Sequence, residues 1–545
     1  MALRACLTGE LRSTWICLAQ ERIRDCMATL EKLRLNKERV SLLAILLLAL
    51  ALRLVNLGSR NLWYDEAFAV LYAEKPLAAM LHGTVTQVGG AAADVHPLFF
   101  YSILHAWMRA VGQSPVAVRA LSALLGVATV AMAYLLARRL FDRQAGLATA
   151  AIVAIAPFHV YYSQEARMYA LLGFAAVAMT YFFVRAWAGG GWGHWVVFGI
   201  CGAMTLYAHN LGFTFVAGLD LWVLWAWLRP GAPRWRNLRP VLLSHLLIVG
   251  LFAPWLTVMP SQFGKIQQAY WVEQPGLAKL IQTILIFHFA YDNQSLPRWL
   301  LPPALFFSLL VLAVVAFEFA RRRTASGPKL SFPTPYSLLL SLTLTPILLT
   351  FLVSQIRPVY IVRALLPSAL TYYTLVVGVL VAGVVPKLVK WGLLLPSTAI
   401  VAISLVHHYS YAQFPRPPFD EAVAYLRENR QSGDAIVHDN KLTFFPCHYY
   451  DRGLPQAFMA DPPGAGSDTL ALPTQEALGL PASRTMEEAT VGSQRVWFVI
   501  FQRALAEYQE LGHPQPPHRT WLEDHYRLIE TVIFNDLDIY LYETP

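Results

Sequence analysis

The sequence predicts a polytopic α-helical membrane protein with about eleven transmembrane helices, interfacial helices in its external loops and a small C-terminal α/β domain. Three observations predict this fold class. Hydrophobic residues make up 56% of the 545 residues and charged residues only 14%, whereas soluble globular proteins carry roughly 25% charged residues. Eleven apolar runs are long enough to span a hydrocarbon core. After residue 410 the pattern changes to that of a small mixed sheet.

The apolar runs define a membrane domain at residues 40–410. Each run has about 17–22 residues, enough for a helix to cross a hydrocarbon core of roughly 30 Å. Residues 1–39 are charged and mixed, and are expected to form a cytoplasmic N-terminal segment. The runs lie at residues 40–57, 116–137, 145–162, 168–187, 192–208, 211–228, 240–259, 299–319, 336–354, 363–383 and 390–409.

A twelfth run, residues 97–112, is shorter and more polar, and its placement sets the orientation of every later loop. If it lies in the interface or is re-entrant, all basic clusters share the cytoplasmic side with the N-terminal segment. If it crosses, they all face outside. Because cytoplasmic loops are enriched in lysine and arginine, eleven spans are favoured, with the C-terminal domain on the external side. The clusters are Arg138/Arg139/Arg143, Arg229/Arg234/Arg236/Arg239, Arg321/Arg322/Arg323/Lys329 and Lys387/Lys390. Their position in membrane loops accounts for the net charge of +9 without a nucleic-acid partner.

Residues 411–545 are predicted to form an extracytoplasmic α/β domain. The spacing of apolar residues predicts an amphipathic helix at Phe419–Arg430. Stretches rich in Val, Ile, Tyr and Phe predict strands at Asp434–Asp439, Arg495–Phe501 and Leu528–Tyr542. Residues 461–484 are rich in Pro, Gly and Ala and are expected to be a loop. No glycine-rich phosphate loop is present, so nucleotide binding is not predicted for this domain.

The first external loop carries two adjacent carboxylates, Asp65 and Glu66, just after the first span and next to Tyr64. A carboxylate there can act as a general base for an attacking hydroxyl. The alternative is an acid pair that stabilises a helix N-terminus. Further along the same loop lie His96, which could orient a phosphate or carboxylate or serve only structurally, and Tyr101.

The second external loop places Tyr162, Glu165, Arg167 and Tyr169 between two spans with almost no connecting sequence. These side chains must therefore lie at the external rim of the bundle. They could position a polar sugar and its phosphate, or they could form a salt-bridged interfacial turn with tyrosine anchors.

Three further cations, Lys265, Arg357 and Arg363, are expected on the same side. Arginine and lysine suit phosphate oxygens, although basic residues at span ends also extend toward water without any binding role. Two ionisable residues fall within the predicted spans, Arg53 in the first and Asp220 in the sixth. Such residues are functional candidates by default.

The order and placement of these motifs resemble those of the GT-C glycosyltransferases, in the bacterial family 39-like branch related to protein O-mannosyltransferases and to the lipid A aminoarabinose transferase. The motifs are the Asp-Glu pair after the first span, His96-Pro97 before the interfacial segment, and Ser163-Gln-Glu-Ala-Arg-Met-Tyr169 after the third span. The segment Arg357-Pro-Val-Tyr-Ile-Val-Arg-Ala-Leu-Leu-Pro367 is similar to a later motif of the same family. The resemblance covers roughly residues 40–410.

The resemblance implies an inverting transfer of a sugar from a polyprenyl-phosphate carrier to a hydroxyl of a glycan, lipid or protein on the external side of the membrane. It implies that Asp65 is the catalytic base, that Glu66 is its neighbour in the motif, and that Glu165 is the acidic residue of the second loop. His96 stands where the aminoarabinose branch has lysine. Leu98 and Ala364 depart from the pattern of many relatives and leave donor and acceptor identity open.

No cofactor is required by this chemistry, although Asp65, His96 and Glu165 could ligate a divalent cation; their spacing identifies no metal. The prenyl tail is expected along residues 260–298, where Tyr270, Trp271 and Leu277–Phe289 indicate an interfacial helix. The main alternative function is a transporter or flippase of lipid-linked sugars, which Asp220 favours. A non-catalytic membrane scaffold would leave the charged rim unexplained.

Overall fold

The computed structural model describes most of the chain. Outside it lie residues 1–35 of the expected cytoplasmic segment, the basic residues Arg229, Arg234, Arg236 and Lys329, and Tyr270 and Trp271. The described residues are 36–228, 237–268, 272–291, 296–325, 335–383, 385–410, 417–460, 470–510, 512 and 514–545.

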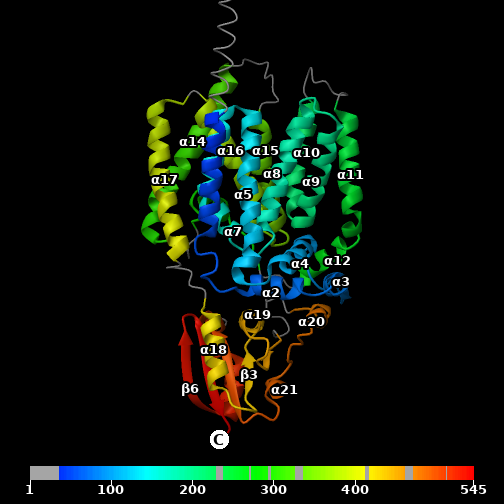
Figure 1. Cartoon of the computed structure of the whole chain (residues 1–545), viewed down its shortest axis with the longest axis vertical. Coiled ribbons are helices and arrows are strands. Elements are labelled where there is room, and N and C mark those ends of the chain that lie inside the picture. The colour runs from blue at the N-terminus through cyan, green and yellow to red at the C-terminus, as the bar shows by residue number, and fades with distance from the viewer. Residues whose placement is uncertain are drawn as a thin grey trace, which may run out of the picture.

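The membrane domain is a bundle of long helices with short helices gathered at one end (Figure 1). Every one of the eleven predicted apolar runs is helical, which confirms a mostly helical membrane fold. The α-helices within the predicted apolar runs are a helix at residues 36–54, α5 (Pro115–Leu140), α6 (Arg143–Ile155), α7 (Pro157–Ser163), α8 (Tyr169–Trp187), α9 (Trp192–Ala208), α10 (Gly212–Leu228), α11 (Leu238–Leu256), α14 (Leu301–Ala325), α15 (Pro335–Ser354), α16 (Leu366–Ala382) and α17 (Lys387–Ser410). The shorter elements are α2 (Tyr64–Ala73), α3 (Leu77–Val85), β1 (Gln87–Val88), β2 (Ala91–Ala92), α4 (Phe99–Val111), α12 (Met259–Gln268), α13 (Ala278–Phe289), and the 3-10 turns η1 (Arg298–Leu300) and η2 (Val362–Leu365).

Seven of the described helices are long and apolar enough to cross a membrane, or eight if the bent pair α6 and α7 is one span. The chain is therefore an integral membrane protein, while the count of eleven spans stays a prediction. The run at 97–112 forms α4, which has 13 residues and lies with α2 and α3 at the end of the bundle (Figure 1). That position is the one expected of an interfacial helix.

The break between α6 and α7 explains the buried Arg53. The two helices meet at an angle of 61° where Pro157 interrupts the hydrogen-bond ladder. Arg53 Nη1 donates to the carbonyl of Ala154 at 3.1 Å, and Nη2 lies 2.8 Å from His159 Nδ1. The guanidinium thus satisfies a carbonyl that the break leaves without its helical partner. Arg53 stabilises the broken span, which leads directly into the second loop.

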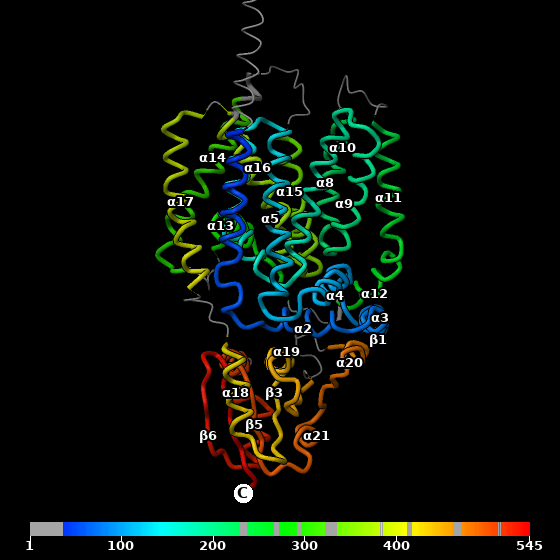
Figure 2. The backbone as a smooth tube through the Cα atoms, in the orientation of Figure 1, coloured from blue at the N-terminus to red at the C-terminus, as the bar shows by residue number. Residues whose placement is uncertain are grey.

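The two ends of the bundle carry different groups. At one end, Glu38 lies 3.3 Å from Arg138 and 3.4 Å from Arg143, so the start of the first helix and the end of α5 are together. This agrees with the prediction that the N-terminal segment and this basic cluster share a side. The opposite end carries α2, α3, α4 and α12, and it faces the C-terminal domain (Figures 1 and 2).

The C-terminal domain is a five-stranded mixed sheet in the order β4-β3-β5-β7-β6. β3 is parallel to β4 and β5, and β7 is antiparallel to β5 and β6. The expected helix at Phe419–Arg430 is present as α18, but α20 places a helix where residues 461–484 were expected to be a loop; residues 461–469 lie outside the described chain. The elements are α18 (Phe419–Asn429), β3 (Ala435–His438), α19 (Lys441–Tyr450), β4 (Gln456–Phe458), α20 (Leu472–Leu478), α21 (Met486–Thr490), β5 (Arg495–Phe501), α22 (Gln502–Glu510), α23 (Pro517–His525), β6 (Arg527–Phe534) and β7 (Leu537–Glu543).

This domain packs directly on α2 and α3. The ring of Phe445, on α19, lies 5.8 Å from that of Tyr64 and 5.7 Å from that of Phe68. On α20, Thr474 Oγ1 donates to the carbonyl of Gly83 at 2.7 Å. A side chain on Gly83 would come within 2.7 Å of Ala477, so glycine permits this close approach. The sheet domain therefore covers the helices that carry the first predicted motif.

Candidate active site

The first turn of α2 presents its two carboxylates to different surroundings. The Asp65 side chain is 15% exposed, and its Oδ2 lies 3.4 Å from Arg363 Nη1 and 3.8 Å from Arg167 Nε. Both Asp65 Oδ2 and Arg167 Nε are buried and make no hydrogen bond within the part of the chain that the structure describes. The Asp65 carboxylate thus retains hydrogen-bonding capacity beside two guanidinium groups.

Glu66, in contrast, is fully buried and saturated with hydrogen bonds. Arg119, on α5, donates to both of its carboxylate oxygens, at 2.8 and 2.7 Å. The backbone amide of Ala166 donates to the same carboxylate at 3.0 Å. Arg119 also donates to the carbonyls of Leu57 and Arg60, at 2.8 Å each. The pair therefore joins the end of the first span, α2, α5 and the second loop.

The second loop brings Arg167 to the Asp65 carboxylate. Arg167 Nη1 donates to the Asp65 carbonyl and to the Tyr101 hydroxyl, at 3.3 Å in each case. Glu165 is buried two residues before it, and its carbonyl accepts a hydrogen bond from the Arg167 amide at 2.8 Å. The predicted neighbourhood of the first and second loops is therefore present in the structure.

Electrostatics keep the Asp65 carboxylate ionised. Burial alone would raise its pKa, but the charges of Arg167, Arg363 and His96 outweigh burial and hold the pKa below the ordinary value. Burial likewise opposes the charge on Arg167, but Asp65 together with Tyr101, Tyr169 and Asp94 more than offsets burial and raises the Arg167 pKa well above its usual range. Asp65 can accept a proton at neutral pH because it carries none.

His96 is oriented by Asp94. The Asp94 carboxylate accepts hydrogen bonds from the backbone amide of His96 at 3.0 Å and from its ring Nδ1 at 2.9 Å. Because a carboxylate only accepts, the ring proton is on Nδ1 and Nε2 faces away from Asp94. Asp94 was not among the residues selected from the sequence, although it stands two positions before His96.

Two of the aromatic candidates, Tyr169 and Tyr162, lie on the side of Arg363. The Arg363 guanidinium lies 5.3 Å from the centre of the Tyr169 ring, and the Tyr162 ring lies 5.2 Å from that of Tyr169.

The other two predicted cations, Lys265 and Arg357, lie outside the ion pairs of Asp65. Lys265 is partly buried on α12, which packs on the β1–β2 hairpin, and Arg357 is exposed. No contact in the described chain joins Arg357 to Asp65.

Three residues of the site escaped sequence-based prediction: Asp94, Arg119 and His209. Arg119 gave one signal, a charge in the first turn of an otherwise apolar run. His209 follows α9, and its ring lies 6.3 Å from that of His96 and 6.0 Å from that of Tyr169. For a lone histidine between two spans, the sequence does not distinguish a functional role from a structural one.

The residues that could ligate a cation do not assemble as a metal site. Within the described chain, no group of three or more His, Cys, Asp and Glu side chains is arranged to hold a metal ion. Asp65 faces two guanidinium groups, and His96 Nδ1 is bonded to Asp94. Asp65, His96 and Glu165 therefore do not form a ready-made group of three ligands among the described residues.

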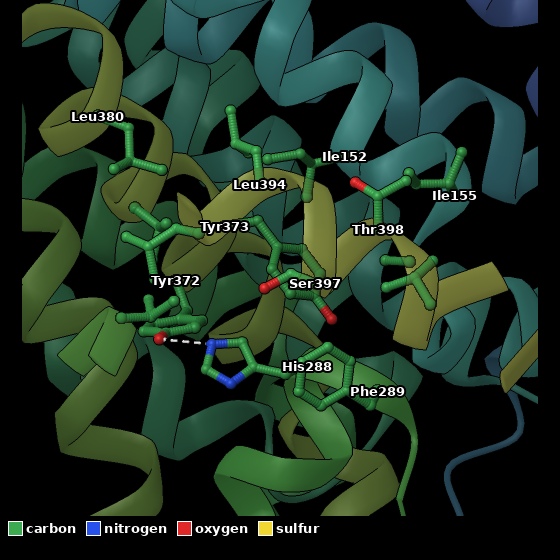
Figure 3. A pocket seen from close by; sticks show the side chains of 15 residues that line it. Ile152, Ile155, His288, Phe289, Tyr372, Tyr373, Leu380, Leu394, Ser397 and Thr398 are labelled. Atoms are coloured by element: carbon green, nitrogen blue, oxygen red, sulfur yellow. Dashed lines mark hydrogen bonds between the residues drawn. The ribbon is translucent and has the colours of Figure 1, made fainter. Parts of the chain in front are cut away.

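An apolar cavity of about 110 Å³ lies between α6, α13, α14, α16 and α17 (Figure 3). The expected helix at Leu277–Phe289 is present as α13, and its residues His288 and Phe289 line the cavity. His288 Nε2 lies 2.8 Å from the Tyr372 hydroxyl, so the main polar groups of the wall are paired with each other. The remaining wall is largely aliphatic.

Comparison with known proteins gives one match to a family model and several to solved structures. The family model described as dolichyl-phosphate-mannose-protein mannosyltransferase matches residues 95–258. No curated protein matches the sequence. Among solved structures, ArnT from Cupriavidus metallidurans in the apo state aligns with a TM-score of 0.58 and 11% identity, over 92% of this chain and 97% of that chain.

A second fold match comes from an archaeal enzyme. The oligosaccharyltransferase AglB from Archaeoglobus fulgidus, in complex with an inhibitory peptide and a dolichol-phosphate, aligns with a TM-score of 0.52 and 12% identity over 92% of this chain and 74% of that chain. The chain has the fold of the GT-C glycosyltransferases. In this fold, helix α2, which carries Asp65, and the sheet domain lie at the same end of the bundle (Figure 1).

Proposed function

We propose that this protein is an inverting glycosyltransferase that moves a sugar from a polyprenyl-phosphate carrier to a hydroxyl acceptor on the external side of the membrane. The observation that carries the proposal is the Asp65 carboxylate, whose buried Oδ2 lies beside Arg167 and Arg363 and makes no hydrogen bond within the described residues. Such a group can accept a proton while the adjacent guanidinium groups neutralise a departing phosphate. The GT-C fold and the family match at residues 95–258 support this assignment.

In the proposed reaction the acceptor oxygen attacks the anomeric carbon of the sugar. The new carbon–oxygen bond forms as the bond to the carrier phosphate breaks, and Asp65 Oδ2 takes the proton of the acceptor hydroxyl. Arg167, Arg363 and His96 hold the phosphate that departs with the carrier. Glu165 and the tyrosines Tyr64, Tyr101, Tyr162 and Tyr169 shape the space around the sugar, and Lys265 and Arg357 supply charge at the approach to the site. Glu66 acts as a positioning residue rather than as a second base.

The carrier tail needs an apolar surface next to this site. We place it along α13, whose His288 and Phe289 line the apolar cavity between α6, α14, α16 and α17 (Figure 3). The acceptor is then expected to approach from the side of the sheet domain, which packs on α2 and α3. A glycan, a lipid or a protein hydroxyl would satisfy this geometry.

The deciding experiment compares the wild-type protein with Asp65→Asn in membranes, using radiolabelled polyprenyl-phosphate hexoses and an extract of glycans and lipids as acceptor. Asparagine keeps the shape of the side chain but cannot take the proton, so transfer should fall about 10²–10⁴-fold at equal expression. Transfer that survives the substitution would move the base to Glu66 or Glu165. Movement of labelled carrier across the bilayer without sugar transfer would replace the proposal with transport.

A further inference from the structure

His209 occupies the short connection between α9 and α10, next to the cluster that contains Asp65. The side chain is 7% exposed. Its ring is flanked by His96 and Tyr169, with ring centres 6.3 and 6.0 Å away. His96 is a candidate phosphate ligand, and the Tyr169 ring stacks on Arg363. His209 therefore lies between two parts of the proposed sugar-phosphate site.

One hydrogen bond fixes the protonation of this ring. The backbone amide of Leu211 donates to His209 Nδ1 at 3.0 Å. Because a backbone amide nitrogen can only donate, Nδ1 must carry a lone pair and the ring proton must be on Nε2. An imidazolium could not accept this bond, so His209 is neutral. The surroundings agree, since burial first, and then the charges of His96, Arg363 and Arg167, hold its pKa well below the ordinary value.

The remaining ring nitrogen is a donor with no acceptor. Among the described residues, none accepts a hydrogen bond from Nε2, and Nε2 is not one of the buried polar atoms that lack a partner. The Nε2–H group is therefore left without an acceptor at an edge of the ring that the described residues do not fully enclose.

We propose that His209 is a neutral hydrogen-bond donor to the sugar-phosphate substrate, with Nε2–H donating to an oxygen of the phosphate or of the adjoining sugar. This inference rests on the proposed function and adds a binding residue to it. A neutral donor fits the position chemically, because another cation close to Asp65 would further lower the basicity of that carboxylate. The backbone of Leu211 holds the ring so that it can only donate on the substrate side.

Two substitutions separate this role from a structural one. His209→Asn keeps an acceptor at the position of Nδ1, where the asparagine oxygen can accept from the Leu211 amide as in an Asx turn, but it removes the group at Nε2. His209→Gln places an amide donor at the reach of Nε2 and loses the Nδ1 acceptor. His209→Phe keeps the ring and removes both polar functions.

The test uses the full-length protein in detergent, with undecaprenyl phosphate as a binding probe and labelled polyprenyl-phosphate hexoses as donors. We expect the Kd for the probe, or the KM for the donor, to rise about tenfold in both His209→Asn and His209→Phe. This is the loss expected for one hydrogen bond to a charged or polar ligand. His209→Gln should recover most of the lost affinity. An effect on undecaprenyl phosphate itself would identify a phosphate oxygen as the acceptor. An effect limited to the hexosyl donors would identify a sugar oxygen.

Any other ranking of the three variants by affinity for the probe or the donor contradicts the inference. Wild-type behaviour of His209→Asn together with a defect in His209→Gln would show that the side chain only holds the connection between α9 and α10. A thermal unfolding measurement on each variant verifies that binding is compared between folded proteins. A wild-type protein that neither binds the probe nor transfers sugar would contradict the proposed function itself, which is distinguishable from failure of the variants alone.

Discussion

Two of the bundle regions that carry ionisable side chains are built differently. At the end next to the sheet domain, Asp65 and Glu66 are contacted by arginines from three separate parts of the chain, and all of these side chains are mostly or fully buried. Between α10 and α11, Asp220 and His245 form a single pair at 2.8 Å, and the Asp220 side chain is 46% exposed. Both regions place charged residues within apolar sequence. Of the two, only the region around Asp65 and Glu66 has buried charged side chains joined by several ion pairs.

This difference bears on the choice between enzyme and transporter. An ionisable residue on a transport path is expected to face the bundle interior or a water-filled cavity. Asp220 instead lies partly exposed on the outside of the helices and has its charge paired by the neighbouring helix. The feature that favoured transport in the sequence therefore has a local explanation in the structure.

The largest effect on folding stability should come from the buried pair of Glu66 and Arg119. Glu66→Gln leaves the Arg119 guanidinium without its counter-charge, and breaking a buried ion pair in this way costs roughly 3–5 kcal/mol of folding stability. Because the pair also holds the backbone beside Arg167, sugar transfer should fall at least tenfold. Thermal unfolding and transfer rates of the purified variant measure the two losses.

Asp65→Asn is the matched comparison for this experiment, since it changes the neighbouring carboxylate by the same chemistry. We expect it to lower transfer about 10²–10⁴-fold and to cost less stability than Glu66→Gln, because Asp65 Oδ2 makes no hydrogen bond within the described residues, whereas Arg119 donates to both oxygens of Glu66. If Glu66→Gln instead lost transfer as strongly and unfolded no more readily than Asp65→Asn, Glu66 would take part in the chemical step and the positioning role would be wrong.

A smaller and more specific effect should appear in the pH profile of Arg363→Gln. The Asp65 pKa is held below its ordinary value partly by Arg363, so the reactive carboxylate of the wild-type protein persists as the pH falls through the usual aspartate range. Removing this guanidinium should raise the pKa, and the acid limb of kcat/KM should move upward by about 1 pH unit. The profile between pH 4 and 8 measures this shift.

Arg357→Gln supplies the control, because it removes the same charge from an exposed arginine that has no contact with Asp65 in the described chain. Its acid limb should coincide with that of the wild-type protein. Equal shifts in the two variants would mean that the profile reports the overall charge of the surface and not the Asp65 ion pair.

The sequence predicted the features that depend on local pattern. Runs of about 20 apolar residues became helices, and the strand predicted at Arg495–Phe501 has those same bounds. The segment Leu528–Tyr542, predicted as continuous strand, is instead a hairpin of β6 and β7 with a turn at Asn535, whose φ is 60°. Asparagine tolerates this left-handed conformation, so the signal was present but was outweighed by the apolar residues on both sides.

Features that depend on distant partners were not predictable in this way. The sequence identified Asp65 and Glu66 together but could not separate their roles, because Arg119 is 53 positions from Glu66. His209 became recognisable only when folding placed it between His96 and Tyr169. The candidate residues were thus found by type and order, whereas their roles followed from which backbone and side-chain groups the fold brings to each of them.

The smallest effect is expected from Asp220→Asn. The pair with His245 is partly exposed, and interhelical polar contacts in membranes contribute only about 0.6 kcal/mol on average. Sugar transfer should therefore stay within about twofold of the wild-type rate, and reconstituted protein should show no change in the movement of a fluorescent polyprenyl phosphate between leaflets. A tenfold loss of either activity would give Asp220 a functional role despite its exposure and would restore the transport hypothesis. Asp220→Asn and Asp65→Asn make the same change of carboxylate to amide in the two regions. Normal transfer and normal carrier movement in Asp220→Asn, together with loss of transfer in Asp65→Asn, would assign the chemistry to the region around Asp65.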